Sequence, residues 1–191
     1  MPDFKIHSGE NATGERSDAL KDISMRYGRV PNVLGAMAES PAAIRGYLAL
    51  GDALRASTLT PTERHVVWFT INRKHGCHYC MAAHTPHART EDVAEDVIAA
   101  ARNGTPYGDA RLEALSGFTR TMVEKRGWLE PAEVDAFLAA GFTKENVFEI
   151  ILAIAHKVMT NYTNHLVEPV LDEEFQPYEW TPAAPADKAA E

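Results

Sequence analysis

The chain has 191 residues, of which 45% are hydrophobic, 24% are charged and 8% are aromatic. This composition is typical of one globular domain with enough apolar mass for a core, and it excludes fibrous and largely disordered proteins. The formal net charge is −8, and the sequence has no basic stripe. We therefore expect no nucleic-acid partner and no membrane partner.

The first residues show no basic stretch followed by an apolar one, which a secretory signal would have. The longest apolar run within the expected helices covers residues 150–155, which is far too short for a bilayer span. The only cysteines, Cys77 and Cys80, are separated by two residues. A reducing compartment makes such close thiols useful for redox or metal chemistry, so we expect a cytoplasmic protein.

Hydrophobic periodicity predicts helices along nearly the whole chain. The first covers residues 18–27 and ends at Gly28. Ser40 and Pro41 are typical of an N-cap and a first helical turn, so a second helix is expected to begin there. A capping box over residues 60–63, with proline at the first helical position, begins a third.

After Gly76, a further helix is expected to begin over residues 77–84. Thr90 and Glu91 are expected to cap another helix, which runs to about Arg102. No segment alternates apolar and polar residues long enough to indicate a strand, so the predicted fold class is all-α. Three more helices are expected over residues 110–125, over residues 131–140, and from residue 143 towards residue 166.

Residues 1–171 are expected to form a single domain. Residues 172–191 hold six acids, one lysine and no apolar period, which predicts an extended acidic tail. A weak repeat at an offset of 83 residues places Thr60 on Thr143 and Tyr79 on Tyr162. If this repeat is real, two similar helical hairpins pack together, and only the first has kept its thiols.

Cys77, Cys80 and His84 form the pattern C-x-x-C-x-x-x-H, and on a helix all three share one face. Cys80 and His84 are neighbours four residues apart, so the imidazole can hold or receive the thiol proton. Cys77 lies in the opening turn, where free amides and the helix dipole favour a thiolate. Thiols this close can form a disulfide when either is oxidised, which is typical of a thiol peroxidase or a disulfide reductase.

The sequence LTPTERHVVWFTINRKHGCHYCMAAHT, residues 59–85, resembles the signature of the carboxymuconolactone decarboxylase and alkylhydroperoxidase D superfamily. The peroxidase branch of that superfamily carries a glutamate, eleven residues, and then C-x-x-C-x-x-x-H. Residues 141–165 are also similar to the family, and the resemblance covers roughly residues 15–170. It implies a small helical bundle of the alkylhydroperoxidase D type that assembles into homo-trimers or hexamers.

The resemblance also implies a role for each residue of the motif. The cysteine matching Cys80 attacks the hydroperoxide with help from the histidine matching His84. The cysteine matching Cys77 then resolves the sulfenic acid as a disulfide, which a dithiol partner such as a lipoylated protein reduces. No metal or organic cofactor is required.

Two positions depart from the family pattern. The glutamate of the family falls on His65, and Glu63 lies about 200° away around the helix. Either His65 takes over the proton relay, or Glu63 reaches the site through a shifted helix, or the relay is absent. Glu63 already has a structural role as the third residue of its capping box. The second departure is Tyr79, which stands between the thiols where the family has a histidine, and here the histidine is His78.

The sequence leaves other interpretations open. A cluster of histidines raises the possibility of a tetrahedral zinc site. Its ligands would be Cys77, Cys80 and His84 with His87 or His65. A lactone enzyme of the carboxymuconolactone decarboxylase type is another alternative, although its chemistry needs no cysteine pair. The polar residues Asn161, Tyr162, Asn164 and His165 either contact another subunit or form a second wall of the pocket.

The favoured function is thiol-dependent reduction of an alkyl hydroperoxide. Cys80 would be the attacking thiolate, Cys77 the resolving thiol and His84 the base. His65 or Glu63 would be a further proton carrier. A non-enzymatic zinc-binding or redox-sensing oligomer is the alternative from a different class of protein.

Overall fold

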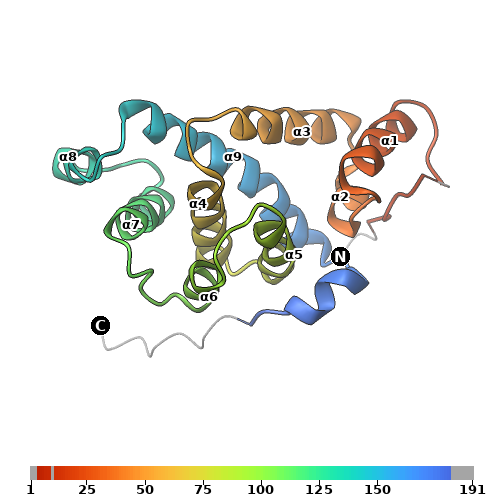
Figure 1. Ribbon diagram of the computed structural model, residues 1–191. Helices are drawn as coiled ribbons and strands as arrows, with labels where there is room; N and C mark the ends of the chain where they lie inside the picture. Colours follow the sequence, from red (N-terminus) through yellow and green to blue (C-terminus); the bar gives the residue numbers. More distant parts are fainter. Residues whose placement is uncertain (1–3, 10, 182–191) are drawn as a thin grey trace, which may run out of the picture.

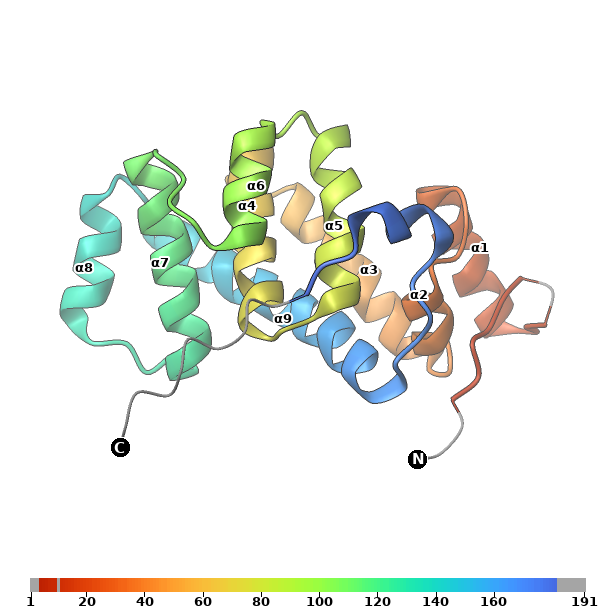
Figure 2. The ribbon, with the colours of Figure 1, turned by 90° about the horizontal axis from the view of Figure 1, so that it is seen from below.

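The computed structural model describes residues 4–9 and 11–181. These residues form nine α-helices and one short 3-10 helix, with no strand among them, so the all-α prediction is confirmed (Figures 1 and 2). No helix among them is long and apolar enough to cross a membrane. The helices are α1 (Glu15–Tyr27), α2 (Asn32–Met37), α3 (Pro41–Arg55), α4 (Pro61–Lys74), α5 (His78–Thr90), α6 (Glu95–Asn103), α7 (Ala110–Lys125), α8 (Pro131–Ala139), α9 (Lys144–Val167) and the 3-10 helix η1 (Glu173–Tyr178).

Several helices begin where the local sequence signals predict. Thr60 and Glu63 form the capping box of α4, in which each side chain accepts a hydrogen bond from the backbone of the other residue. Ser40 caps α3 and Thr143 caps α9, again through side-chain oxygens. Each cap satisfies amide groups that the helix leaves unpaired, and the signal therefore locates these helix starts to the residue.

The boundary between α5 and α6 differs from the prediction. α5 continues to Thr90 and α6 begins only at Glu95, so the N-cap predicted at Thr90 and Glu91 is wrong. The Thr90 hydroxyl donates a hydrogen bond of 2.8 Å to the backbone carbonyl of His87. Threonine can bond backwards to a carbonyl as well as forwards to an amide, and here it stabilises the end of one helix instead of starting the next.

The predicted repeat holds only where two helices start. Thr60 and Thr143 both cap helices, but α4 ends and the chain turns through Gly76 at φ 65°, whereas α9 continues unbroken to Val167. Met159 occupies the position equivalent to Gly76. A residue with a side chain disfavours the left-handed backbone of such a turn. Residues 144–167 are therefore one helix and not a hairpin.

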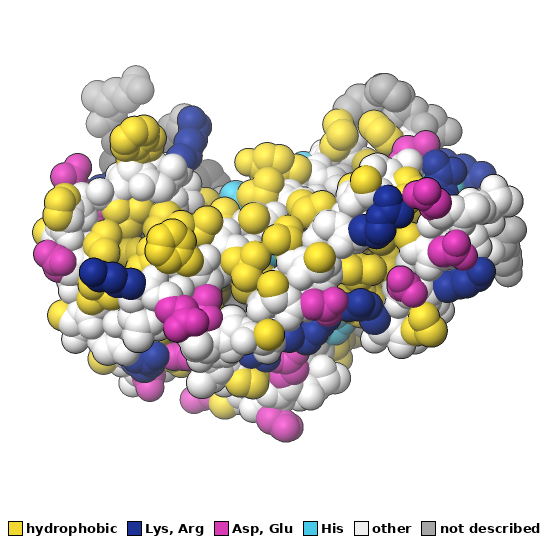
Figure 3. All heavy atoms as spheres, turned by 90° about the horizontal axis from the view of Figure 1, so that it is seen from above, with side chains coloured by type: hydrophobic (Ala, Val, Ile, Leu, Met, Phe, Trp, Pro, Cys, Tyr) yellow, Lys and Arg dark blue, Asp and Glu magenta, His cyan; other side chains and the backbone are white. Residues whose placement is uncertain are grey.

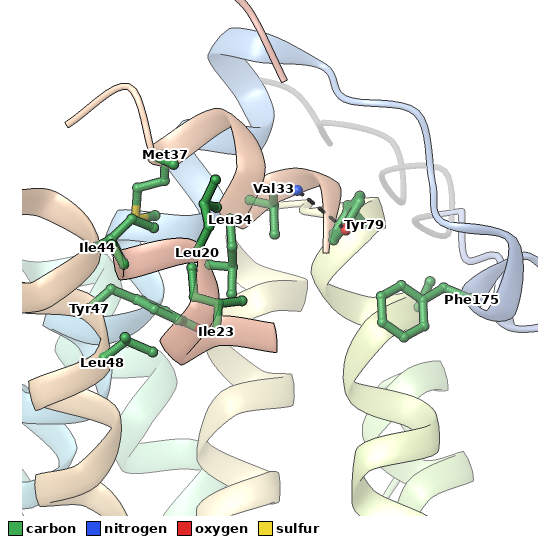
Figure 4. Packing of buried hydrophobic residues seen from close by; sticks show 13 residues of the cluster. Leu20, Ile23, Val33, Leu34, Met37, Ile44, Tyr47, Leu48, Tyr79 and Phe175 are labelled. Atoms are coloured by element: carbon green, nitrogen blue, oxygen red, sulfur yellow. Dashed lines mark hydrogen bonds between the residues drawn. The ribbon is translucent and has the colours of Figure 1, made fainter. Parts of the chain in front are cut away.

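Two apolar clusters form most of the core. Helices α1, α2 and α3 pack with α5 and η1 around the first cluster, part of which is drawn in Figure 4. Helices α4, α7, α8 and α9 surround the second. Helix α4 contacts α5, α6, α7 and α9, so it occupies the centre of the molecule (Figure 1).

The described part of the predicted tail is folded. Helix η1 packs on α5, and the Phe175 ring is buried against Tyr79 (Figure 4). Asp172 forms an ion pair with Arg29 and accepts a hydrogen bond from the Tyr79 hydroxyl. The prediction of an extended tail is therefore wrong for residues 172–181, because one aromatic anchor and a paired acid hold the segment in place. Residues 182–191 lie outside the described residues.

Candidate active site

Three helices bring the two cysteines together with buried polar side chains. The sharp turn at Gly76 leads from α4 into α5, and Cys77 is the N-cap of α5. Cys80 follows in the first turn of α5, and His84 follows one turn later. Helices α4 and α9 pack against α5. They contribute His65 and Trp68 from α4, and Lys157, Thr160 and Asn164 from α9.

Both cysteines are free thiols, and Cys77 and Cys80 are only 1% and 3% exposed. Asn164 lies between them, and its Nδ2 donates hydrogen bonds to Sγ of Cys80 at 3.2 Å and to Sγ of Cys77 at 3.5 Å. The amide NH₂ has two donors, so each sulfur can receive its own. The pair is thus held together while both sulfurs are reduced, which favours closure into a disulfide on oxidation.

The surroundings stabilise a thiolate on Cys80. Burial acts to raise the pKa of Cys80, but the hydrogen bond from the Cys77 thiol and the positive charge of Lys157 oppose it. The nearby polar side chains of Thr160 and Asn161 add to this effect, and the pKa of Cys80 falls to about 5. The hydrogen bond to Cys80, together with burial, raises the pKa of Cys77. The surroundings therefore favour a thiolate on Cys80 and a protonated thiol on Cys77.

Lys157 is the residue of this site that the sequence does not predict. Its side chain is 1% exposed, and its Nζ lies 2.7 Å from Nε2 of His84. Burial and the charge of Lys157 hold the pKa of His84 well below its usual range, so the imidazole is neutral and its Nε2 accepts the hydrogen bond. A buried ammonium is unfavourable unless it is compensated. The thiolate of Cys80 supplies the compensating charge.

Cys80 lines a cavity of about 280 Å³, which we call the first cavity. Tyr47 stacks on His156 with ring centroids 4.3 Å apart. Burial, with the charges of Lys157 and Arg55, lowers the pKa of His156 to about 3, so this ring is also neutral. A dry cavity of about 150 Å³ already accepts benzene, so the first cavity has room for a small organic molecule. Its lining includes His65, Trp68, His84, Glu91, His156 and Lys157.

Of the two residues expected to relay protons, His65 lines the first cavity. Its Nε2 lies 3.5 Å from a carboxylate oxygen of Glu91, and its ring meets that of His84 edge-on with centroids 6.1 Å apart. Burial lowers the pKa of His65 to about 4, so the ring is neutral at pH 7. Glu91 thus brings a carboxylate to the site from the end of α5, where the sequence suggested only a helix cap.

Glu63 does not line the first cavity. Its Oε2 accepts a hydrogen bond of 2.8 Å from the backbone N–H of Thr60, and its Oε1 accepts one of 2.8 Å from Nε of Arg111. Arg111 lies over the Phe142 ring at 3.8 Å from the ring centroid. Both oxygens of Glu63 are therefore used to start α4 and to join it to α7, and no shifted helix brings this acid to the cysteines.

The residues expected for a zinc site do not form one. Among the described residues, no group of three or more His, Cys, Asp or Glu side chains is placed to hold a metal ion. Instead, Nε2 of His84 faces Lys157, and the two sulfurs share Asn164.

The polar segment near the end of α9 has two faces with different surroundings. Asn161 and Asn164 are buried, and Nδ2 of Asn161 donates a hydrogen bond of 3.0 Å to Asn72. Tyr162 is exposed on the opposite side of the helix, and His165 is exposed at its flank, where it lines the same cavity as Asn164. Asn161 and Asn164 thus form a wall of the site, as one of the two interpretations expected, whereas Tyr162 faces away.

Together, the fold and the site define an all-α protein with a buried dithiol. Residues 41–120 match the model of the carboxymuconolactone decarboxylase family. The resemblance inferred from the sequence is therefore confirmed. No curated protein matches the chain.

Solved structures share the fold. One is an uncharacterized peroxidase-related protein from Ralstonia eutropha JMP134 that has an alkylhydroperoxidase AhpD core. Its TM-score is 0.76 and its sequence identity is 22%, and the match covers 90% of this chain and 93% of that chain. Another peroxidase-related protein, from Silicibacter sp. TM1040, has TM-score 0.70 and 21% identity over 84% of this chain and 86% of that one. The debrominase Bmp8 in complex with 2,3,4-tribromopyrrole has a TM-score of 0.71 and 16% sequence identity, and the match covers 84% of this chain and 87% of that chain.

Proposed function

We propose that the protein reduces an alkyl hydroperoxide with the two electrons of its Cys77–Cys80 dithiol. The observation that carries this proposal is the buried pair, in which Cys80 lies in the field of Lys157 and opens onto a cavity while Cys77 is held beside it. The family fold with a close cysteine pair supports peroxidase-related chemistry in general, and two structural neighbours carry that description.

The reaction starts at the thiolate of Cys80, which attacks the outer oxygen of R–O–O–H. The O–O bond breaks, and the products are a sulfenic acid on Cys80 and an alkoxide. Lys157 stabilises the developing negative charge and donates a proton to the alkoxide. The sulfur of Cys77 then attacks the sulfenic sulfur, and hydroxide leaves with the thiol proton as water. An external dithiol, for example on a lipoylated protein, returns two electrons to the resulting disulfide.

In this scheme His84 acts through Lys157. Because Cys80 is already ionised at neutral pH, it needs no direct base, and Nε2 of His84 is bonded to the ammonium in any case. His84 positions Lys157 and exchanges protons with it. His65 and Glu91, on the same cavity wall, form a second path for protons and take the place of the glutamate of the family.

Reductive dehalogenation of an aromatic ring is the second candidate. It too consumes the two electrons that a dithiol releases on forming a disulfide. The observation in its favour is the aromatic lining of the first cavity, with Trp68 and the stacked pair of Tyr47 and His156, in a fold shared with a debrominase. A lactone decarboxylase of this family needs no cysteine pair, so the buried dithiol argues against that alternative.

Thiol counting tests the proposed function. Reduced protein receives one equivalent of cumene hydroperoxide and is then denatured, and the remaining thiols are titrated. We expect wild type to lose both thiols and Cys80→Ser to lose none. Cys77→Ser should lose its single thiol as a sulfenic acid, which dimedone traps.

Three results would contradict this assignment. If Cys77→Ser is inert while Cys80→Ser reacts, the roles of the two thiols are reversed. If all variants keep their thiols, the protein is not a peroxidase. In that case, release of bromide from a brominated pyrrole, with loss of both thiols, would identify the second candidate.

A further inference from the structure

The two cysteines line different cavities. The first cavity includes Cys80 among the described residues that line it, and a second cavity of about 450 Å³ includes Cys77. The second cavity lies between the start of α5, the end of α9 and the C-terminal segment, which crosses α5 in Figure 2. Its lining includes Cys77, Asn164, His165, Leu171, Glu179 and Trp180. The dithiol therefore forms the partition between two spaces.

We propose that the second cavity is the binding site of the reductant, and that a small, uncharged dithiol enters it and attacks Sγ of Cys77 in the oxidised protein. This inference rests on the redox cycle proposed above. It adds that the oxidant and the reductant reach the cysteine pair from different sides.

The wall of the second cavity is fixed in place. The indole Nε1 of Trp180 donates a hydrogen bond of 2.9 Å to the backbone carbonyl of Arg102, and the carbonyl of Trp180 lies 2.8 Å from Nδ1 of His78. The Arg102 guanidinium also donates to the backbone carbonyls of Tyr178 and Glu179. The C-terminal segment thus forms a built wall opposite Cys77.

Asn164 provides an unused binding group. Its Nδ2 serves the two sulfurs, whereas its Oδ1 is buried and has no hydrogen-bond partner among the described residues. A buried amide oxygen without a partner is unfavourable. A thiol S–H or another donor on an incoming molecule would satisfy it beside Cys77.

Charge and shape narrow the class of reductant. Glu168 and Glu179 are exposed acids in the lining, and their carboxylates repel an anionic reductant. Leu171 and Trp180 offer apolar contact for a short carbon chain. An uncharged dithiol fits both features.

Attack at Cys77 also releases the better leaving group. Thiol–disulfide exchange is faster when the sulfur that leaves has a low pKa. When Cys77 is attacked, the departing sulfur is Cys80, where Lys157 and Asn164 stabilise the thiolate. Attack at Cys80 would instead expel Cys77, whose pKa is raised.

A thiolate of the reductant, formed by loss of one proton to solvent, attacks Sγ of Cys77. The Cys77–Cys80 bond breaks, Cys80 leaves as thiolate, and a mixed disulfide joins Cys77 to the reductant. The second thiol of the reductant then attacks its own bonded sulfur and closes a cyclic disulfide. Cys77 leaves and takes up the remaining thiol proton, so that two electrons have passed to the protein.

The first experiment locates the attacked sulfur in the wild-type chain. The cysteine pair is oxidised with diamide, so the test does not depend on peroxidase activity, and is then treated with 2-mercaptoethanol and quenched with acid. Tandem mass spectrometry should find the mixed disulfide on Cys77. A mixed disulfide on Cys80 would overturn the proposal.

The second experiment compares the two cavities. His165→Trp fills the second cavity and Ala83→Leu fills the first, while Val170→Trp places the same indole on an exposed position next to the second cavity. With dihydrolipoamide as reductant of the diamide-oxidised protein, we expect His165→Trp to slow reduction several-fold and the other two variants to match wild type. Slowing by Ala83→Leu alone, or by none of the three, would overturn the proposal.

Two further rate measurements complete the test. Dihydrolipoate carries the same dithiol as dihydrolipoamide but has an anionic end, and we expect it to react more slowly, with the difference reduced in the double variant Glu168→Gln, Glu179→Gln. Equal rates in wild type would overturn the charge selectivity. The rate of thiol loss with cumene hydroperoxide is measured in parallel. If peroxide does not react, the proposed function fails, while the reduction assay still reports on the second cavity.

Discussion

At the scale of single residues, Lys157 determines which sulfur is charged. Its Nζ is buried beside the cysteine pair, and its charge opposes the effect of burial on Cys80. Replacement by methionine keeps most of the volume and removes the charge. In a Cys77→Ser background, we expect Lys157→Met to raise the ionisation midpoint of Cys80 by about 1–3 pH units. The ultraviolet absorbance of the thiolate measures this midpoint.

The same change should alter the pH dependence of the reaction with peroxide. The thiolate is the reactive form and the pKa of Cys80 is lowered to about 5, so the wild-type rate should stay level down to about pH 6 and fall as the pH drops through 5. In Lys157→Met the fall should begin at higher pH. Lys74→Met, at a lysine that pairs with Glu124 on the surface, is the matched control. Identical profiles for all three proteins would show that Lys157 does not charge Cys80.

The sequence identifies the sulfur chemistry of the site but not its electrostatics. The spacing of Cys77, Cys80 and His84 is visible in the chain because one helix carries all three. Lys157 lies 73 residues after His84, and a lysine within a helix is ordinarily exposed. Its burial results from the crossing of α9 over α5, which no local pattern encodes. The sequence suggests only a capping role for Glu91, because its contact with His65 depends on how α5 packs against α4.

At the scale of elements, helix η1 is an integral part of the fold. Phe175 is 4% exposed and contacts Tyr79 and the Arg29 guanidinium. We expect Phe175→Ala to lower the free energy of unfolding by about 3 kcal/mol, because it leaves a cavity between η1 and α5. Urea denaturation measures the loss. Gln176→Ala, at an exposed neighbour, should have almost no effect. Equal stability of both variants would show that this segment does not contribute to the fold.

Helix boundaries follow from sequence where a cap or a glycine acts locally. The starts of α3, α4 and α9 and the turn at Gly76 are of this kind. The N-cap predicted at Thr90 is wrong because a threonine hydroxyl can form a hydrogen bond at either end of a helix. The short α2 and η1 cannot be predicted from periodicity, since each has only six residues and depends on the packing of its neighbours.

At the scale of the whole molecule, α9 has an unusual distribution of side chains. Its buried face is largely polar and includes Asn146, Glu149, His156, Lys157, Thr160, Asn161 and Asn164. Its exposed face carries Phe148, Ile151, Ala155, Tyr162 and Leu166, which share one side of the helix. Hydrophobic side chains also gather at several places on the face seen in Figure 3. An apolar stripe of this length is typical of a surface that contacts another protein.

We expect this stripe to join copies of the chain into a homo-oligomer. Light scattering should give the mass of a trimer or hexamer for wild type, and the double variant Phe148→Glu, Ile151→Glu should give smaller species, because it places two charges in the interface. Arg120→Glu, at an exposed position on α7, should keep the wild-type mass. A monomeric wild type at micromolar concentration would contradict this expectation.

The distribution of side chains on α9 links the folding of the site to association of the chains. The inner face of α9 carries amides, a lysine and a histidine, so its burial contributes little favourable free energy. The outer face is apolar, and it contributes favourable free energy only when another surface covers it. If copies of the chain cover it, much of the driving force that seats Lys157 beside Cys80 comes from association. A newly made, solitary chain would then hold its thiols in a looser setting, and full reactivity would appear only as chains meet.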